Sequence, residues 1–341
     1  MRLPWGDELA IDLGTANTHI CVKDAGVVVR EPSVIAFDAG GRRPVAVGLE
    51  AKRMLERDVE GVVVVRPIRS GVVANFDAAV AMLRSFIQQA LGHRPLFNPL
   101  VIISHPNDAT LVEQRALVDA VRAAGGGQLL SVQRALATAL GGGLQISGDA
   151  SQLVIDLGAG ITNVSVVAMG LATTGISIRY GGDDLDESLR RAIKRTQGIR
   201  ISPSSAEQVK LHVGTLLPPD QSESMRVDGV GANGEPAVGA DISLTDIPDL
   251  LARSLNRVVS EIAWLLEELP PRQQSEVAAT GAVLTGGGAL LGGIDSYFAE
   301  MLGIPVKVAT DPPSCTILGL EAVLNDPHAL SLGGRRFKTA G

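Results

Sequence analysis

Apolar residues recur at helical spacing in several stretches of the chain. In the clearest of these, residues 254–269, seven apolar side chains three or four positions apart form one stripe. The same spacing predicts four helices, over residues 77–91, 111–124, 183–196 and 254–269. Short runs rich in β-branched residues predict strands at residues 27–29, 33–37, 62–65 and 100–104. Strands that alternate with helices place the chain in the α/β class.

One sequence pattern occurs twice. Residues 10–18 read AIDLGTANT and residues 154–164 read VIDLGAGITNV. In both, an apolar run leads to an aspartate, Asp12 or Asp156, then to a glycine-containing turn and a second apolar run. Each copy is typical of a β-hairpin, and the two are separated by close to half of the 341 residues. The repeat therefore predicts two related domains that face each other.

The composition narrows the classes of protein to consider. Hydrophobic residues make up 45% of the chain, which is enough for a packed core and excludes wholesale disorder. A formal net charge of −7 and an aromatic content of 3% argue against nucleic acid as a partner. Two cysteines far apart in the sequence are typical of a reducing compartment. No apolar run approaches the ~20 residues of a membrane span, and the first residues lack a signal-peptide pattern, so we expect a cytoplasmic protein.

The turns of the two hairpins carry candidate chemistry. Turns of small residues present backbone N–H groups that can hold phosphate oxygens. The first turn consists of Gly14, Thr15, Ala16 and Asn17, and the second of Gly158, Ala159, Gly160 and Ile161. Asp12 and Asp156 would face one cleft from opposite sides, and carboxylates there suit Mg²⁺ with its bound water. The alternative for either motif alone is a tight hairpin without a ligand, but two copies favour a phosphate site.

A third glycine cluster lies late in the chain. Residues 284–291 read LTGGGALL, with an apolar strand before the glycines and a helix expected after them. Gly286, Gly287 and Gly288 would let a flat ring or a phosphate lie against the backbone. The alternative is a strand-to-helix turn that binds nothing. The formal GxGxxG at residues 229–234 lies in a polar context and is interpreted as a hairpin turn.

Taken in order, these motifs resemble those of the actin-like ATPase superfamily and, within it, of the MreB family of bacterial actin homologues. The segments that carry the resemblance are IDLGTANT at 11–18, EPSVIAF at 31–37, VGLEAKRM at 47–54, RPIRSGVVANFDAAVAMLRSFI at 66–87, IRYGGDDLDESL at 178–189, AEQVKLHVG at 206–214 and LTGGGALLGGI at 284–294. The resemblance implies duplicated actin-like (ribonuclease H-like) domains around a nucleotide cleft, each with a smaller subdomain. It places subdomain IA at residues 1–32, 67–143 and 316–341, subdomain IB at 33–66, subdomain IIA at 144–181 and 247–315, and subdomain IIB at 182–246.

The same resemblance implies ATP with Mg²⁺ as the ligand of the cleft. The residues that would bind it are Asp12, Gly14, Thr15, Ala16, Asn17, Asp156, Gly158, Ala159, Gly160, Gly182, Glu207, Lys210, Gly286, Gly287, Gly288 and Ala289. Asp12 and Asp156 would hold the metal through its bound water. Glu207 and Lys210 are three positions apart on a predicted helix and would reach the ribose and base. The alternative for these two is a solvent-exposed ion pair on the helix.

The chain departs from the MreB pattern where water would be activated. The family's Glu-Pro pair corresponds to Arg134 and Ala135, and a family glutamate of the second hairpin corresponds to Asn163. An arginine cannot accept a proton from water. Gln133, one position away, is the catalytic candidate that could orient the water instead. We therefore expect ATP binding with weak or absent hydrolysis.

Leu96 and Phe97 lie in a loop flanked by prolines, at residues 93–99. MreB proteins carry a hydrophobic loop here that inserts into the membrane, so the resemblance implies a protein on the inner face of the cell membrane. The alternative is that both side chains pack inward. Burying them gives about 3–6 kcal/mol at most, which corresponds to roughly millimolar binding. A filament that repeats the loop would bind far better than a single chain.

These inferences combine into the expectation of an ATP-binding, membrane-associated, actin-like filament protein that organises cell shape and wall synthesis. Its partners would be further copies of itself, the cytoplasmic membrane surface and the membrane proteins of cell-wall elongation. Arg134 and Asn163 favour the alternative of a non-hydrolysing actin-fold module that recruits proteins or regulates filaments. A small-molecule kinase of the same superfamily is the weaker alternative, because the sequence offers no catalytic aspartate beyond Asp12 and Asp156.

Overall fold

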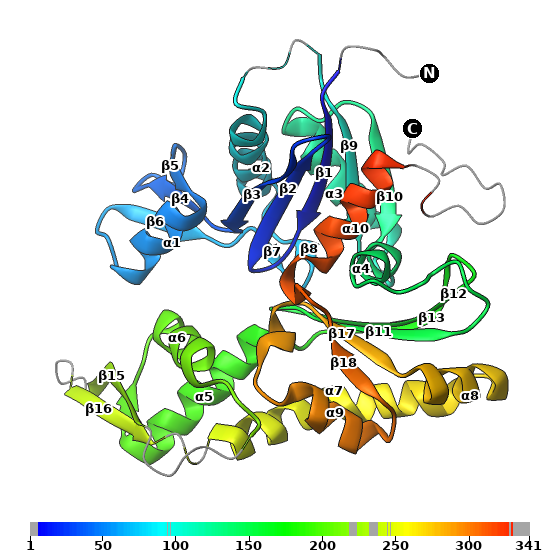
Figure 1. The fold of residues 1–341 in the computed structure, drawn as a ribbon. Coiled ribbons are helices and arrows are strands. Elements are labelled where there is room, and N and C mark those ends of the chain that lie inside the picture. The colour runs from blue at the N-terminus through cyan, green and yellow to red at the C-terminus, as the bar shows by residue number, and fades with distance from the viewer. Residues whose placement is uncertain are drawn as a thin grey trace.

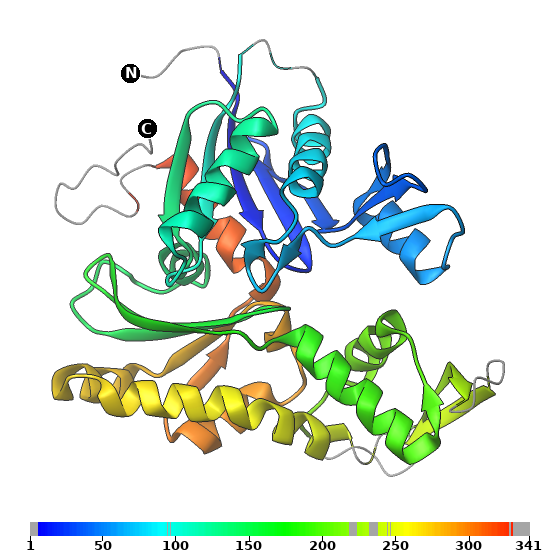
Figure 2. The same ribbon diagram turned by 180° about the vertical axis from the view of Figure 1, so that it is seen from behind.

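The structure is a computed structural model. It describes residues 6–326, apart from 94, 96, 218–223, 232–237, 244 and 246, together with residue 329. Two halves, each built on a five-stranded sheet, lie one above the other in Figure 1. A small sheet with its own helices extends from each half, and both small sheets lie on the same side of the molecule (Figures 1 and 2).

The sheet of the first half begins with an antiparallel meander. Its strands are β1 (Glu8–Leu13), β2 (Asn17–Val22) and β3 (Gly26–Pro32). On the other side of β1, β9 (Leu100–His105) and β10 (Leu129–Gln133) add parallel strands. The strand order is therefore β10-β9-β1-β2-β3.

The sheet of the second half repeats this plan. Its meander consists of β11 (Gln152–Leu157), β12 (Thr162–Ala168) and β13 (Leu171–Ile178). The parallel strands are β17 (Ala282–Thr285) and β18 (Val306–Val308), in the order β13-β12-β11-β17-β18. Matching order and direction confirm the duplicated fold that the two hairpin motifs predict.

Helices make the remaining layers of the two halves. α2 (Phe76–Leu91) and α3 (Leu111–Ala123) pack on the outer face of the first sheet in one apolar core. α4 (Arg134–Gly141) and α10 (Cys315–Asn325) lie between the two sheets (Figure 1). Their apolar residues contact β1, β2, β9 and β10 on one side and β11 and β12 on the other, in a single buried cluster. This middle layer therefore fixes one half against the other.

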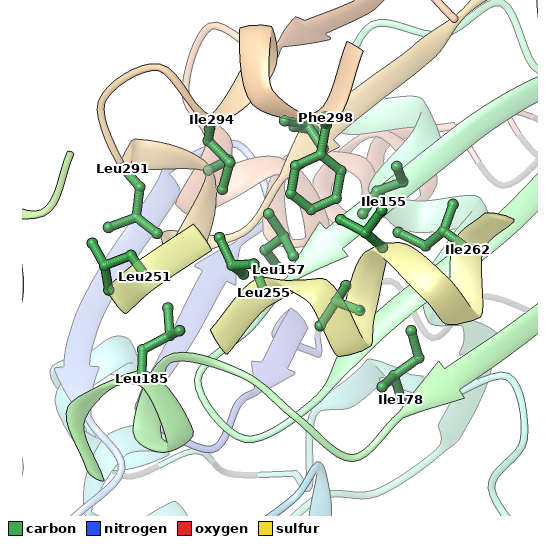
Figure 3. Close-up of a cluster of buried hydrophobic side chains, with 14 of the residues drawn as sticks. Ile155, Leu157, Ile178, Leu185, Leu251, Leu255, Ile262, Leu291, Ile294 and Phe298 are labelled. Carbon is green, nitrogen blue, oxygen red and sulfur yellow. The ribbon is translucent and has the colours of Figure 1, made fainter. Parts of the chain in front are cut away.

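The second half has the largest core, arranged around α7 (Ile247–Glu268). Figure 3 shows Leu251, Leu255 and Ile262 of this helix among side chains of β11 and of α9 (Ile294–Leu302). The sequence predicts this helix from residue 254, but it begins earlier, because Ile247 and Leu251 extend the buried stripe. α8 (Pro271–Thr280) follows it.

The two small sheets flank the opening between the halves. β4 (Ile35–Asp38), β5 (Pro44–Val47) and β6 (Val62–Val65) carry α1 (Gly48–Glu56), and the short pair β7 (Ile68–Arg69) and β8 (Val72–Val73) leads back. Opposite them lie β14 (Ile199–Arg200), β15 (Ser224–Gly231) and β16 (Val238–Ser243), with α5 (Gly182–Gln197) and α6 (Pro203–Val213). The exact subdomain boundaries stay a prediction.

Within the described part of the chain, no helix is both long enough and apolar enough to cross a membrane. α7, at 22 residues, carries charged side chains at both ends, among them Asp249, Arg253, Glu267 and Glu268.

α4 and α10 approach so closely that only glycine fits at their crossing. A Cβ atom on Gly319 would overlap the carbonyl oxygen of Ala137, and one on Gly141 would overlap that of Cys315. Both obstacles are backbone atoms, so rotating a side chain cannot relieve them. The close packing of α4 against α10 in the middle layer therefore depends on these two glycines.

We predict that Gly319→Ala lowers the free energy of unfolding by about 3 kcal/mol or more, because the helices must move apart. The better helix propensity of alanine offsets only about 1 kcal/mol of this loss. Urea unfolding measures the change. Gly40→Ala is the matched control, because a Cβ there meets only Asp38 Oδ1 at 3.7 Å. Equal stabilities of the two variants would contradict the prediction.

Candidate functional site

A cavity of about 490 Å³ lies between the two halves, where the ends of the matching hairpins meet. This volume is within the usual range for a small-molecule site. The predicted binding residues that line it are Asp12, Gly14, Thr15, Ala16, Asn17, Asp156, Gly158, Ala159, Gly182, Glu207, Lys210, Gly286, Gly287 and Gly288. Residues from all three glycine clusters are thus brought to one cavity.

The two hairpin turns have the same backbone geometry. In the first, the N–H of Gly14 donates to the carbonyl of Asn17, and in the second, Gly158 donates to Ile161, both at 3.0 Å. A Cβ on Gly14 would come within 2.6 Å of the Asn17 oxygen, and one on Gly158 within 2.7 Å of the Ile161 oxygen. Glycine is required in both turns because the chain folds back on itself.

The third glycine cluster lies against the second hairpin. Gly286 has a φ of +79°, and a Cβ there would lie 2.5 Å from the carbonyl oxygen of Leu157. Gly288 also packs on Leu157, whereas a Cβ on Gly287 would meet nothing within 4 Å. The expected helix does not follow directly, because residues 287–290 form a 3₁₀ turn and α9 begins at Ile294.

Three predicted residues are not among those that line the cavity in the described structure. Gly160 lies where the two hairpins touch, and its Cβ would come within 2.9 Å of Thr15 Cγ2. Ala289 is buried in the core of the second half. Gln133 is exposed at the end of β10, directly before α4. The position of Gln133 gives its predicted role no support, and that role stays a prediction.

Arg134, the first residue of α4, joins the two halves at the floor of the cavity. Its Nη1 donates to Asp12 Oδ1 at 2.5 Å and its Nε donates to Asp156 Oδ2 at 2.7 Å. The side chain of Arg134 is 17% exposed, and those of the aspartates are 4% and 5% exposed. In the sequence, Arg134 is notable only because the resemblance to the MreB pattern implies a glutamate at this position. Nothing in the sequence indicates that Arg134 bridges both aspartates.

The bridge controls the charge of the floor. Burial alone would raise the pKa of Asp12, but the Arg134 guanidinium, helped by His19, outweighs burial and lowers it to about 2. Burial alone would lower the pKa of Arg134, but Asp12 and Asp156 outweigh it and raise this pKa above its usual range. Asp12 and Arg134 are therefore both charged at neutral pH.

Each aspartate has a nitrogen-bearing side chain directly opposite it in its hairpin. The strand register pairs Asp12 with His19 and Asp156 with Asn163. Among the described residues, neither His19 Nδ1 nor Asn163 Nδ2 makes a hydrogen bond, although both are buried in the cavity wall and His19 Nδ1 lies 3.8 Å from Asp12 Oδ2. Asn163 already uses its Oδ1 to accept from Ser177 at 2.9 Å. Unpartnered buried nitrogens are costly, and these two can donate to an anion in the cavity.

This floor does not fit the predicted Mg²⁺ at Asp12 and Asp156. Mg²⁺ needs a near-octahedral shell of oxygens, but the guanidinium already binds one oxygen of each carboxylate. Of the remaining oxygens, Asp12 Oδ2 lies 3.8 Å from His19 Nδ1, and Asp156 Oδ1 accepts from the Thr285 hydroxyl at 3.4 Å. The free groups on the floor are donors, which suit phosphate oxygens.

Ion pairs also cross the cleft nearer its mouth. Lys52 of α1 pairs with Glu207 of α6 at 2.8 Å, and Arg66 pairs with Asp183 at the start of α5 at 3.2 Å. Lys210 instead binds Asp186 and the carbonyl of Gly182, both at 2.9 Å. Glu207 and Lys210 thus both face the cavity, as predicted, but they bind different partners.

Comparisons with known proteins place the chain in a family. A family model described as MreB/Mbl protein matches residues 6–331. Cell shape-determining protein MreB of Escherichia coli (strain K12) is 38% identical over 92% of this chain and 92% of that protein. Cell shape-determining protein Mbl of Bacillus subtilis (strain 168) is 35% identical over 95% of this chain and 97% of that protein.

The chain belongs to the MreB/Mbl family. MreB5 of Spiroplasma citri, solved bound to AMPPNP and to ADP, has the same fold at a TM-score of 0.88 and 29% identity. The match covers 93% of this chain and 96% of MreB5. The chain is therefore an actin-like protein of the family of cell shape-determining proteins. This confirms the resemblance found in the sequence.

The loop that the family resemblance assigns to the membrane is described only in part. Phe97 is 63% exposed, so it does not pack inward. Leu96 lies outside the described residues. His93 pairs with Asp7 at 3.7 Å, which places the start of the loop beside the start of β1.

We predict that Arg134→Met lowers the free energy of unfolding at pH 7 by about 3–5 kcal/mol, because two buried carboxylates lose their cation. The pH dependence reverses as well. In the wild type, the lowered pKa of Asp12 contributes about 2 kcal/mol to stability at pH values above 3.8, which is the ordinary pKa of this side chain. This contribution is lost as the pH falls through about 2. In the variant, burial and repulsion by Asp156 raise the pKa of Asp12, so the free energy of unfolding falls as the pH rises.

Urea unfolding across the acidic and neutral range measures both effects. Arg191→Met is the matched control, because Arg191 is 77% exposed and its one ion pair among the described residues is with Glu187 on its own helix. It should change stability by less than about 1 kcal/mol. A loss in Arg134→Met that is the same at every pH would contradict the bridge.

Proposed function

We propose that the protein binds ATP or ADP in this cleft and that the nucleotide biases the assembly of the protein into polymers that determine cell shape. One observation carries the proposal: the glycine turns of two matching hairpins and a third glycine turn all line one cavity, with unpartnered nitrogen atoms on its floor. MreB5, which shares the fold, was solved with AMPPNP and with ADP. A nucleotide would contact both halves and so favour their closure.

We predict that Gly287→Leu weakens ATP binding at least about tenfold. Its Cβ points into open space and the residue lines the cavity, so the new side chain fills the ligand's volume without overlapping the protein. Each tenfold loss of affinity corresponds to about 1.4 kcal/mol of binding free energy. Equilibrium binding of a fluorescent ATP analogue measures the change.

The control for this variant is Gly40→Leu, in a turn of the first small sheet where Cβ also has room. Thermal unfolding of both variants separates a filled cavity from a damaged fold. Unchanged ATP binding by a folded Gly287→Leu would place the nucleotide elsewhere.

We propose that hydrolysis is slow or absent. Arg134 stands where the family glutamate would be, it is charged, and it has no lone pair to accept a proton from water. Release of phosphate from ATP tests this point against an Arg134→Glu variant. Equal rates in the two proteins would show that Arg134 is not the reason for slow turnover.

The small size of a single chain supports the proposal that the protein polymerises. A folded chain of this length has a radius of gyration of about 20 Å, far smaller than a bacterial cell, so a single molecule cannot set cell shape. A head-to-tail contact between copies generates an open filament without limit of length. We propose such filaments, with the cytoplasmic membrane surface and membrane proteins of wall elongation as further partners.

The exposed Phe97 supports a peripheral position on the inner face of the cell membrane. We predict that Phe97→Ser reduces binding to lipid vesicles at least about tenfold under polymerising conditions, because about 2–3 kcal/mol of apolar burial is lost at each repeat. Co-sedimentation measures the bound fraction, and electron microscopy on a lipid monolayer with ATP shows the filaments.

Trp264→Ser is the control for membrane binding, since Trp264 is 54% exposed but lies on α7 in the other half. Equal loss in both variants would point to nonspecific adhesion. Nucleotide binding without filaments under any condition would favour the alternative of a recruiting or filament-regulating module, which Arg134 and Asn163 also favour.

A further inference from the structure

Arg134 has more hydrogen-bonding capacity than its bridge uses. A guanidinium carries five N–H donors in a planar fork. The bond from Nη1 to Asp12 and the bond from Nε to Asp156 use two of them. Arg134 lines the cavity, so the three N–H donors that the bridge does not use are left for a ligand there. Such a fork matches the oxygens of a phosphate.

The surroundings of Arg134 add further nitrogen atoms. Within the described residues, Asn163 Nδ2 and His19 Nδ1 are buried in the same cavity wall without a hydrogen bond, and His19 Nδ1 lies 3.8 Å from Asp12 Oδ2. Among the described residues, no group of three or more His, Cys, Asp or Glu side chains is arranged to hold a metal ion. The two carboxylates that could attract a cation are already bridged by one.

We propose that Arg134 is a built-in cation that takes the place of Mg²⁺ on Asp12 and Asp156, so that the cleft binds the phosphates of a nucleotide without a divalent metal. The inference rests on the proposed nucleotide binding. In this cleft the positive charge is attached covalently to α4, so it is always present and a chelator cannot remove it. Arg134 holds the two aspartates with part of its fork and the phosphate oxygens with the rest.

Binding of a fluorescent ATP analogue in excess EDTA and in excess Mg²⁺ tests the proposal on the full-length wild type. We expect the two affinities to agree within about threefold. A wild-type affinity that Mg²⁺ raises more than about tenfold would overturn the inference, because a metal would then be supplying the charge.

Variants at Arg134 sharpen the test. Arg134→Met should bind at least about tenfold more weakly in EDTA, because charge-assisted hydrogen bonds are lost. Mg²⁺ should restore its binding, since the carboxylates are then free for a metal. Arg134→Lys keeps a cation and should retain binding in EDTA, and the control Arg191→Met should match the wild type in both buffers. Loss of binding in Arg134→Met that Mg²⁺ cannot restore, although the protein is folded, counts against replacement of a metal.

A second readout separates this inference from the proposed function. If the wild type binds no nucleotide in either buffer, the proposed function fails, and the metal question is answered by electron paramagnetic resonance of Mn²⁺ with nucleotide-free protein. We expect the wild type to take up no Mn²⁺ at the bridge. Uptake that Asp156→Asn abolishes would overturn the inference whatever the nucleotide result.

Discussion

Two buried carboxylates face each other at the ends of matching strands, and their repulsion has to be cancelled before the two halves can meet. Asp12 and Asp156 are each at most 5% exposed as side chains, and the guanidinium of Arg134 lies between them. In a buried setting an unbalanced pair of charges is far more costly than on the surface. The two halves also touch at Gly160, where a Cβ would come within 2.9 Å of Thr15 Cγ2.

The bridge is connected to the rest of the fold through α4. Arg134 begins this helix, and Gly141 ends it in contact with Cys315 of α10. The same helix therefore has the cleft floor at one end and the tightest backbone crossing of the middle layer at the other. Any rotation of one half against the other changes the distance from Arg134 to at least one aspartate. Opening of the cleft and the state of the bridge are thus coupled by geometry.

The sequence predicts those parts of the site that depend on local backbone geometry. The glycine turns could be found because Gly14, Gly158 and Gly286 are required by close backbone contacts within or beside one hairpin. The bridge could not be found, because Arg134 lies 122 positions from Asp12 and 22 from Asp156, and only the folded chain joins them. The same limit applies to Gly160, whose neighbours Thr15 and Ser70 come from the other half. The four helices predicted from apolar spacing correspond to α2, α3, α5 and α7, and only the start of α7 differs by more than one residue.

The contacts that close the cleft differ in how salt acts on them. The Lys52–Glu207 and Arg66–Asp183 pairs have side chains between 25% and 38% exposed, whereas the Arg134 bridge is nearly shielded from solvent. Dissolved ions screen charges at the surface over about 8 Å at physiological ionic strength but reach buried pairs much less. A rise in ionic strength therefore weakens the ion pairs at the mouth of the cleft more than the Arg134 bridge, so the alignment of the two halves at the cleft floor withstands salt concentrations that open the rim.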